Sequence, residues 1–117
     1  MPPTEAAHKE AILASIPDMA RELQELLGQR GVAYTTGVRS PKAVGRWLTG
    51  TPPHPNTLKK LRNLYRTVLI LRESYGPETI RAWLEGANPD LGDCAPIDAL
   101  RQGREVDVFH AAEGFTS

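Results

Sequence analysis

Apolar residues in this chain recur at spacings of three and four, and glycines and prolines separate the stretches that show this pattern. One such stretch runs from Met19 to Leu27 and stops at Gly28. This spacing places apolar side chains on one face of a helix. Few stretches alternate apolar and polar residues or are enriched in Val, Ile, Thr and aromatic residues, as strands are. The pattern therefore predicts an all-α protein.

The positions of glycine and proline set the bounds of the predicted helices, because glycine favours helix ends and proline lacks the donor that a helix interior needs. The first helix should end before Pro17, and Asp18 should begin the second. The predicted helices span residues 4–15, 18–27, 29–36, 40–49, 57–75, 77–83 and 104–113, with shorter pieces at 88–92 and from Pro96.

The segment from Ser40 to Thr49 has the clearest helix boundaries in the chain. The Ser40 hydroxyl is placed to cap the helix, Pro41 occupies the first helical position, and Gly50 lies just beyond the end. A short helix of this kind fits the major groove of DNA if one face is apolar and the other carries polar and basic side chains.

The two faces of this short helix separate as DNA recognition requires. Val44, Trp47 and Leu48 form the apolar side, so Trp47 is interpreted as a core residue and not as a base-stacking group. The side chains that point away from it, and that we predict to contact DNA, are Arg39, Ser40, Lys42 and Arg46.

The following long helix, capped by Asn56 or Thr57, has a similar division. Its apolar residues from Leu58 to Leu71 lie on one side, and a basic stripe lies on the other. This stripe, predicted to contact DNA phosphates, consists of Lys59, Arg62 and Arg66. The alternative is an ordinary solvated helix face. Ile70 falls on the outward side and Arg72 on the apolar side, which a subunit contact could explain.

The charged residues are sorted along the chain although the net charge is zero. Residues 38–81 hold nine lysines and arginines against two acidic residues, whereas residues 82–117 hold two against seven. A positive surface attracts polyanions and a negative surface suits a basic partner. The sequence thus predicts a DNA-binding part, residues 1–76, and a protein-binding part, residues 77–117.

Other classes of function find little support. The chain has no apolar run near the roughly 20 residues that span a bilayer, no secretory signal pattern, and a single cysteine, Cys94. These features predict a cytoplasmic protein that does not contact membranes. No nucleophile, phosphate-loop or metal-ligand motif is present, and His8, His54 and His110 are scattered. We therefore expect neither an enzyme nor a bound metal or cofactor.

Two parts of the sequence resemble known families. Residues 31–50, with Gly37-Val38 at the turn, resemble the helix-turn-helix of Xre-like bacterial repressors. The C-terminal part resembles the toxin-binding domain of the Xre/MbcA/ParS antitoxins through Ala82-Trp83-Leu84, Asn88-Pro89-Asp90-Leu91-Gly92 and Ala95-Pro96-Ile97-Asp98-Ala99-Leu100. Together the two resemblances cover about residues 18–115.

This resemblance implies the antitoxin of a type II toxin–antitoxin pair. Such a protein binds a RES-domain toxin that consumes NAD or transfers from it, covers the toxin's cleft with its C-terminal region, and represses its own operon as a homodimer or a larger hetero-oligomer with the toxin. The residues expected to contact the toxin are Asn88, Leu91, Asp93, Asp98, Asp107, Phe109, Glu113 and Phe115. Deletion of residues 103–117 should abolish neutralisation and leave a folded core. The alternative is a stand-alone helix-turn-helix repressor whose tail dimerises or senses a ligand.

Overall fold

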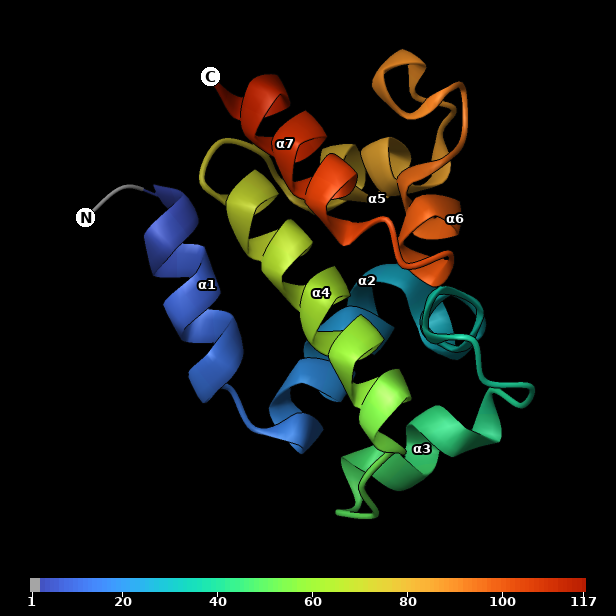
Figure 1. Ribbon diagram of the computed structural model, residues 1–117. Coiled ribbons are helices and arrows are strands. Elements are labelled where there is room, and N and C mark those ends of the chain that lie inside the picture. The colour runs from blue at the N-terminus through green and yellow to red at the C-terminus, as the bar shows by residue number, and fades with distance from the viewer. Residues whose placement is uncertain (1–2) are drawn as a thin grey trace.

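The computed structural model describes residues 3–117, with the side chains of residues 3, 4 and 12 outside the description. Within this range the chain is helical and contains no β-strand, which confirms the predicted all-α class (Figure 1). The elements are α1 (Pro3–Leu13), α2 (Ile16–Thr36), α3 (Lys42–Leu48), α4 (Pro55–Arg72), α5 (Pro77–Glu85), the 3-10 turn η1 (Pro89–Leu91), α6 (Pro96–Arg101) and α7 (Glu105–Thr116).

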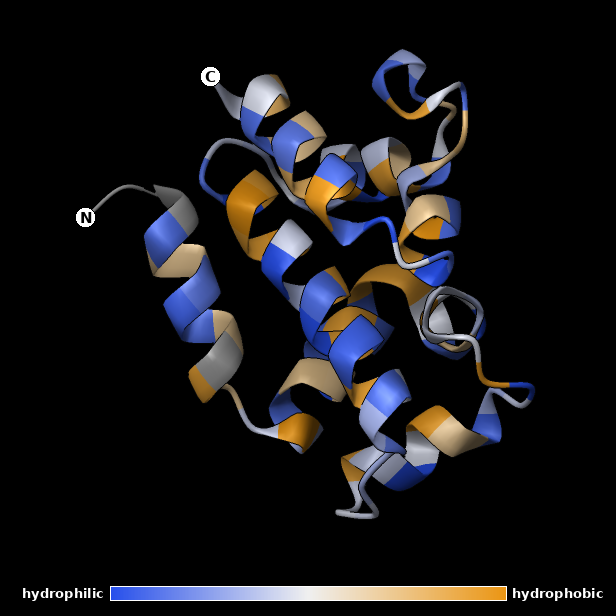
Figure 2. Cartoon of the chain, in the orientation of Figure 1, coloured by the Kyte–Doolittle hydropathy of each residue, from blue (hydrophilic) through white to orange (hydrophobic). Residues whose placement is uncertain are grey.

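Helix α4 lies at the centre of the molecule. It packs against α1, α2, α5, α6 and α7, with α1 and α7 on different sides of it (Figure 1). The run from Val68 to Leu71 is buried all round, and Figure 2 shows this hydrophobic end of α4 between its neighbours. The expectation that Ile70 points outward is therefore wrong, because a central helix has more than one covered face.

The boundary between α1 and α2 falls earlier than predicted. Ser15, which was expected to close the first helix, instead caps the second by accepting a hydrogen bond from the Asp18 N–H at 3.2 Å. Pro17 lies in the first turn of α2, where its missing N–H has no intrahelical partner to lose. The same proline thus starts a helix here, whereas the sequence interpretation used it as a stop.

Two glycines with positive φ shape the middle of the chain. Gly28 has φ 74° and ψ 166°, so it kinks α2 at the break that separates the two predicted helices 18–27 and 29–36. Gly37 has φ 82° and ends α2, where its N–H donates to the carbonyls of Ala33 and Tyr34. A residue in the left-handed region is a common helix end, and glycine adopts it without strain.

Replacing Gly37 by alanine should lower the free energy of unfolding by about 1 kcal/mol, because an L-residue is strained at this φ. A Cβ there would meet only the Lys60 Nζ at 3.9 Å, so the cost is conformational and not steric. Urea unfolding followed by circular dichroism measures it. Gly114→Ala is the matched control, since Gly114 lies inside α7 with open space around it, and it should stabilise the protein slightly. Equal effects of the two changes would contradict the argument.

The starts of α3 and α4 differ by one or two residues from the prediction. Helix α3 begins at Lys42, and the Ser40 hydroxyl accepts a hydrogen bond from the Lys42 N–H at 3.2 Å in the turn before it. Helix α4 begins at Pro55 with His54 at the cap position, where no side chain caps the helix. The predicted caps at Asn56 or Thr57 are wrong, because Pro55 already supplies the first helical residue.

Helix α7 buries a face that includes Val108, Phe109 and Ala112, and it packs against α4. Val106 lies outside this face and is 58% exposed. Deletion of residues 103–117 would expose the apolar end of α4, at a cost of about 25 cal/mol per Å² of apolar surface. The expectation of a folded core after this deletion is therefore corrected: the truncated chain should be strongly destabilised.

Candidate nucleic-acid and protein interfaces

Helix α3 and the turn before it present a basic surface. Val44 and Trp47 are buried where α3 packs against α2, as predicted. The recognition face on the opposite side consists of the exposed residues Arg39, Ser40, Lys42 and Arg46. Among the described residues none of its three cations forms an ion pair. The structure thus gathers four of the predicted DNA contacts on one open segment.

The three other predicted DNA contacts, on α4, have different surroundings. Lys59 is exposed, and its Nζ lies 3.9 Å from the Glu105 carboxylate. Arg62 donates hydrogen bonds to the carbonyls of Ala11, at 2.7 Å, and Ala14, at 3.0 Å, at the C-terminal end of α1. A cation there complements the unpaired carbonyls of a helix end. Arg62 therefore holds α1 against α4.

Arg66 makes the corresponding contact with α7. Its guanidinium lies 4.1 Å from the centroid of the buried Phe109 ring, a cation–π geometry. Both arginines of the predicted stripe are half-buried and engaged within the chain. Of the three residues of the stripe, Lys59 is the exposed one.

The first helix of the predicted helix-turn-helix ends in Tyr34-Thr35-Thr36, a polar sequence for a packed helix. Thr35 and Thr36 are nonetheless buried. Their hydroxyls donate to the carbonyls of Gly31 and Val32, each at 2.8 Å, so both buried hydroxyls are paired. Each hydroxyl is satisfied within its own helix, and the threonine methyl groups remain available for packing.

The C-terminal part carries a second candidate surface, formed around the end of α7. Phe115 is 41% exposed, and its ring lies 4.7 Å from the centroid of Tyr75 and 6.0 Å from that of Trp83. The Tyr75 hydroxyl donates to the Phe115 carbonyl at 2.7 Å, which fixes the end of α7 against the segment after α4. On α7, Asp107 is exposed and pairs with Arg104 at 3.4 Å, and Glu113 is half-buried.

Beside this cluster the surface is hollowed. The aromatic hollow, about 380 Å³ in volume, is lined by Trp83, Ala87, Asn88, Pro89, Asp90, Ala111, Gly114 and Phe115. The Asn88 side chain accepts a hydrogen bond from the Asp90 N–H at 2.9 Å, and its backbone N–H donates to the Cys94 carbonyl at 3.1 Å. These bonds fix the loop at one wall of the hollow.

The eight predicted toxin contacts do not lie together in the structure: some are at the aromatic hollow and others are in the core or elsewhere. Asn88 and Phe115 line the aromatic hollow, and Asp107 and Glu113 follow on α7. Asp93 is exposed in the neighbouring loop. Leu91 and Phe109 are 1% and 6% exposed, so they are core residues and do not reach a partner.

Asp98, the remaining predicted toxin contact, does not line the aromatic hollow. It accepts a hydrogen bond from the hydroxyl of Tyr34 and so faces the second half of α2. This hydrogen bond is the main cause that raises the pKa of the Tyr34 hydroxyl above its ordinary value. Asp98 therefore joins α6 to the helix that precedes the recognition face.

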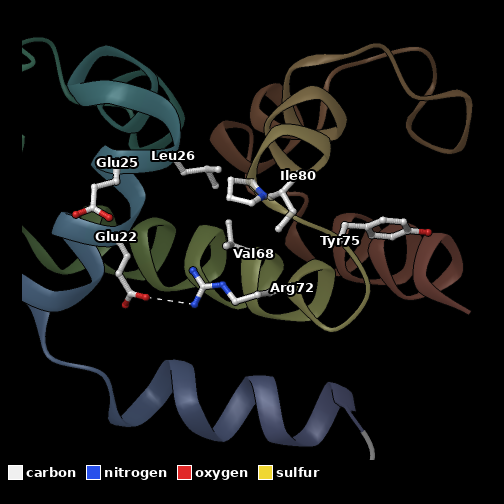
Figure 3. Close-up of a pocket in the computed structure, with 8 residues that line it drawn as sticks. Glu22, Glu25, Leu26, Val68, Arg72, Tyr75 and Ile80 are labelled. Carbon is white, nitrogen blue, oxygen red and sulfur yellow. Dashed lines mark hydrogen bonds and ion pairs between the residues drawn. The ribbon is translucent and has the colours of Figure 1, made fainter.

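A second hollow, of about 260 Å³, lies between α2, α4 and α5 (Figure 3). Glu22 accepts a hydrogen bond from the Tyr65 hydroxyl at 2.6 Å and pairs with Arg72 at 3.2 Å. Burial, and then the bond to Glu22, raise the pKa of Tyr65. This volume is below the 300–1,000 Å³ of typical ligand sites. The ion pair with Glu22 explains Arg72 on the apolar side of α4 without a subunit contact.

Comparison with known proteins gives one informative match. The chain is similar to an antitoxin. The relative, a probable mycobacterial cidal antitoxin of Mycobacterium tuberculosis, is 38% identical over 78 residues. The match covers 65% of this chain and 65% of the antitoxin. No protein-family model and no solved structure matches the chain.

Sequence reasoning missed the contacts that build these surfaces. The Tyr75–Phe115 contact and the bonds from Arg62 to the end of α1 join residues 40 to 51 positions apart. The spacing of neighbouring residues carries no signal for such pairs, because the two residues of each pair are far apart along the chain. Within residues 3–117 no group of three metal-ligating side chains gathers, and no helix is long and apolar enough to span a bilayer.

Proposed function

We propose that this chain is the antitoxin of a type II toxin–antitoxin pair. Its C-terminal part, residues 77–117, covers the active site of a RES-domain toxin that consumes NAD, and its N-terminal part, residues 1–76, binds the operator and represses the operon. The observation that carries the proposal is the 38% identity to a probable antitoxin. The opposite net charges of residues 38–81, which hold the recognition face, and residues 82–117, which hold the aromatic hollow, support it.

The recognition face supports the DNA-binding half of the proposal. Helix α3 is short, packs its apolar side on α2, and turns Lys42 and Arg46 to solvent. Lysine and arginine in this position reach guanine edges in the major groove or neighbouring phosphates. Gly37 ends the preceding helix and allows the chain to turn into α3. These are the elements that a helix-turn-helix requires.

The aromatic hollow supports the toxin-binding half. Interface hot spots are enriched in aromatic residues near a pocket, with charged residues around them. Phe115 and Trp83 supply the aromatic groups, and Asp90, Asp107 and Glu113 supply negative charge on α7 and the adjoining turn. A cleft that binds the phosphates of NAD is basic, so an acidic surface is attracted to it.

Co-expression tests the proposal directly. The gene beside this one should encode a protein that stops growth when expressed alone, and growth should return when both are expressed. The two proteins should co-purify, and the separated partner should consume NAD while the complex does not. A chain that binds its promoter but has no such partner would instead support the stand-alone repressor.

Changing Arg46 to alanine should weaken binding to the native promoter by about 1–3 kcal/mol if its guanidinium reads a base. Fluorescence anisotropy with a labelled duplex measures this change. Arg81→Ala is the matched control, since Arg81 is an exposed arginine on α5. Neutralisation of the toxin should survive both changes. Equal promoter affinities of the two variants would refute the assigned role of Arg46.

A further inference from the structure

A third hollow, of about 330 Å³, lies where the second half of α2, the turn before α3 and helix α6 meet. It is lined by Arg30, Ala33, Tyr34, Val38, Arg39, Pro41 and Arg101. Three arginines from three separate segments therefore surround one space. Arg39 belongs to the recognition face, but Arg30 and Arg101 lie outside it, and Arg101 comes from the acidic part of the chain.

Arg101 is held in place by its neighbours. Its guanidinium lies 4.7 Å from the centroid of the Tyr34 ring and donates a hydrogen bond to the Tyr34 carbonyl at 2.7 Å. Its own carbonyl accepts a hydrogen bond from the Lys60 Nζ at 2.6 Å. An arginine fixed in this way loses less side-chain entropy when it binds an anion.

The charges around this hollow are not balanced by acidic groups. No carboxylate lines it, and Arg30 and Arg39 are exposed without an ion pair among the described residues. The adjoining carboxylate is Asp98, which accepts a hydrogen bond from Tyr34. Three guanidinium groups against one carboxylate leave an excess of positive charge, and the planar guanidinium matches the oxygens of a phosphate.

We propose that this hollow binds a backbone phosphate of the operator beside the recognition face. The inference rests on the proposed DNA binding and extends it to Arg30 and Arg101. Arg39 and Pro41 line the hollow and lead directly into α3, so a duplex on the recognition face passes next to it. Contacts to phosphates fix the register of a reading helix without selecting sequence. Helix α6 of the acidic part then holds the DNA as well.

The salt dependence of binding tests the inference. Each phosphate contact contributes about 0.9 to the slope of log Kobs against log salt concentration. Arg30→Gln and Arg101→Gln should each lower this slope for the native promoter. They should also weaken binding to a scrambled duplex by the same factor, so that the preference for the promoter is unchanged. The control is Arg81→Gln, which removes an equal charge from α5 and should leave the slope as in the wild type.

The outcomes separate this inference from the proposed function. If the wild type binds no promoter duplex, the DNA-binding role itself fails. If the wild type binds but both variants keep the slope of Arg81→Gln, the phosphate site alone is refuted. Arg101 contacts Tyr34, so its replacement could disturb the fold, which circular dichroism checks. The Arg30 side chain makes no hydrogen bond or ion pair within the described residues, so its replacement leaves the fold intact and the slope of Arg30→Gln decides whether the phosphate site exists.

Discussion

Replacing Phe109 by alanine should lower the free energy of unfolding by about 3–5 kcal/mol. The Phe109 ring is 6% exposed in the contact between α7 and α4, and the Arg66 guanidinium packs on it. Removing the ring leaves a cavity and removes the cation–π contact of Arg66. Urea unfolding monitored by circular dichroism measures the loss.

The same change distinguishes a core residue from a partner contact. If Phe109→Ala kept the wild-type stability and lost only the affinity for the toxin, Phe109 would have to reach the partner. Phe109 was expected among the toxin contacts from the family resemblance, whereas its burial assigns it to the core. Phe109→Leu keeps an apolar side chain and should restore part of the stability.

Replacing Phe115 by alanine should weaken binding to the toxin by about 2–4 kcal/mol, as expected for an aromatic hot spot at a pocket. The free energy of unfolding of the variant should change by about 1 kcal/mol or less, because Phe115 is already 41% exposed. Isothermal titration calorimetry with the purified toxin measures the affinity. The matched control is Leu13→Ala, an exposed apolar side chain on α1. Equal affinities of these two variants would contradict the role of the aromatic hollow.

Local sequence signals predicted most of the helices. The spacing of apolar residues identified the buried side of α3, and Gly37 marked a helix end. Gly28 was predicted to end a helix and instead kinks α2. These signals work because helix periodicity and glycine conformation are properties of short segments. Proline gave weaker guidance, since Pro17 can end one helix or begin the next.

What the sequence could not predict depends on how the helices pack. Periodicity assumes one buried face, and α4 has neighbours on several sides, so Ile70 was placed outside and Arg66 was assigned to phosphates. The recognition face was predicted because its residues all lie within one short segment, residues 39–46. The hollow around Arg30 and Arg101 was missed because 70 intervening residues separate its two outer arginines along the chain.

The packing of α7 on α4 also limits how partner preference can change. Helices from both parts share one core. A chimera joined near residue 77 would therefore pack two apolar surfaces that do not fit each other. Substitutions that leave this core intact are thus confined to exposed side chains, such as those at the rim of the aromatic hollow. Such positions can be exchanged one at a time while the interior stays the same.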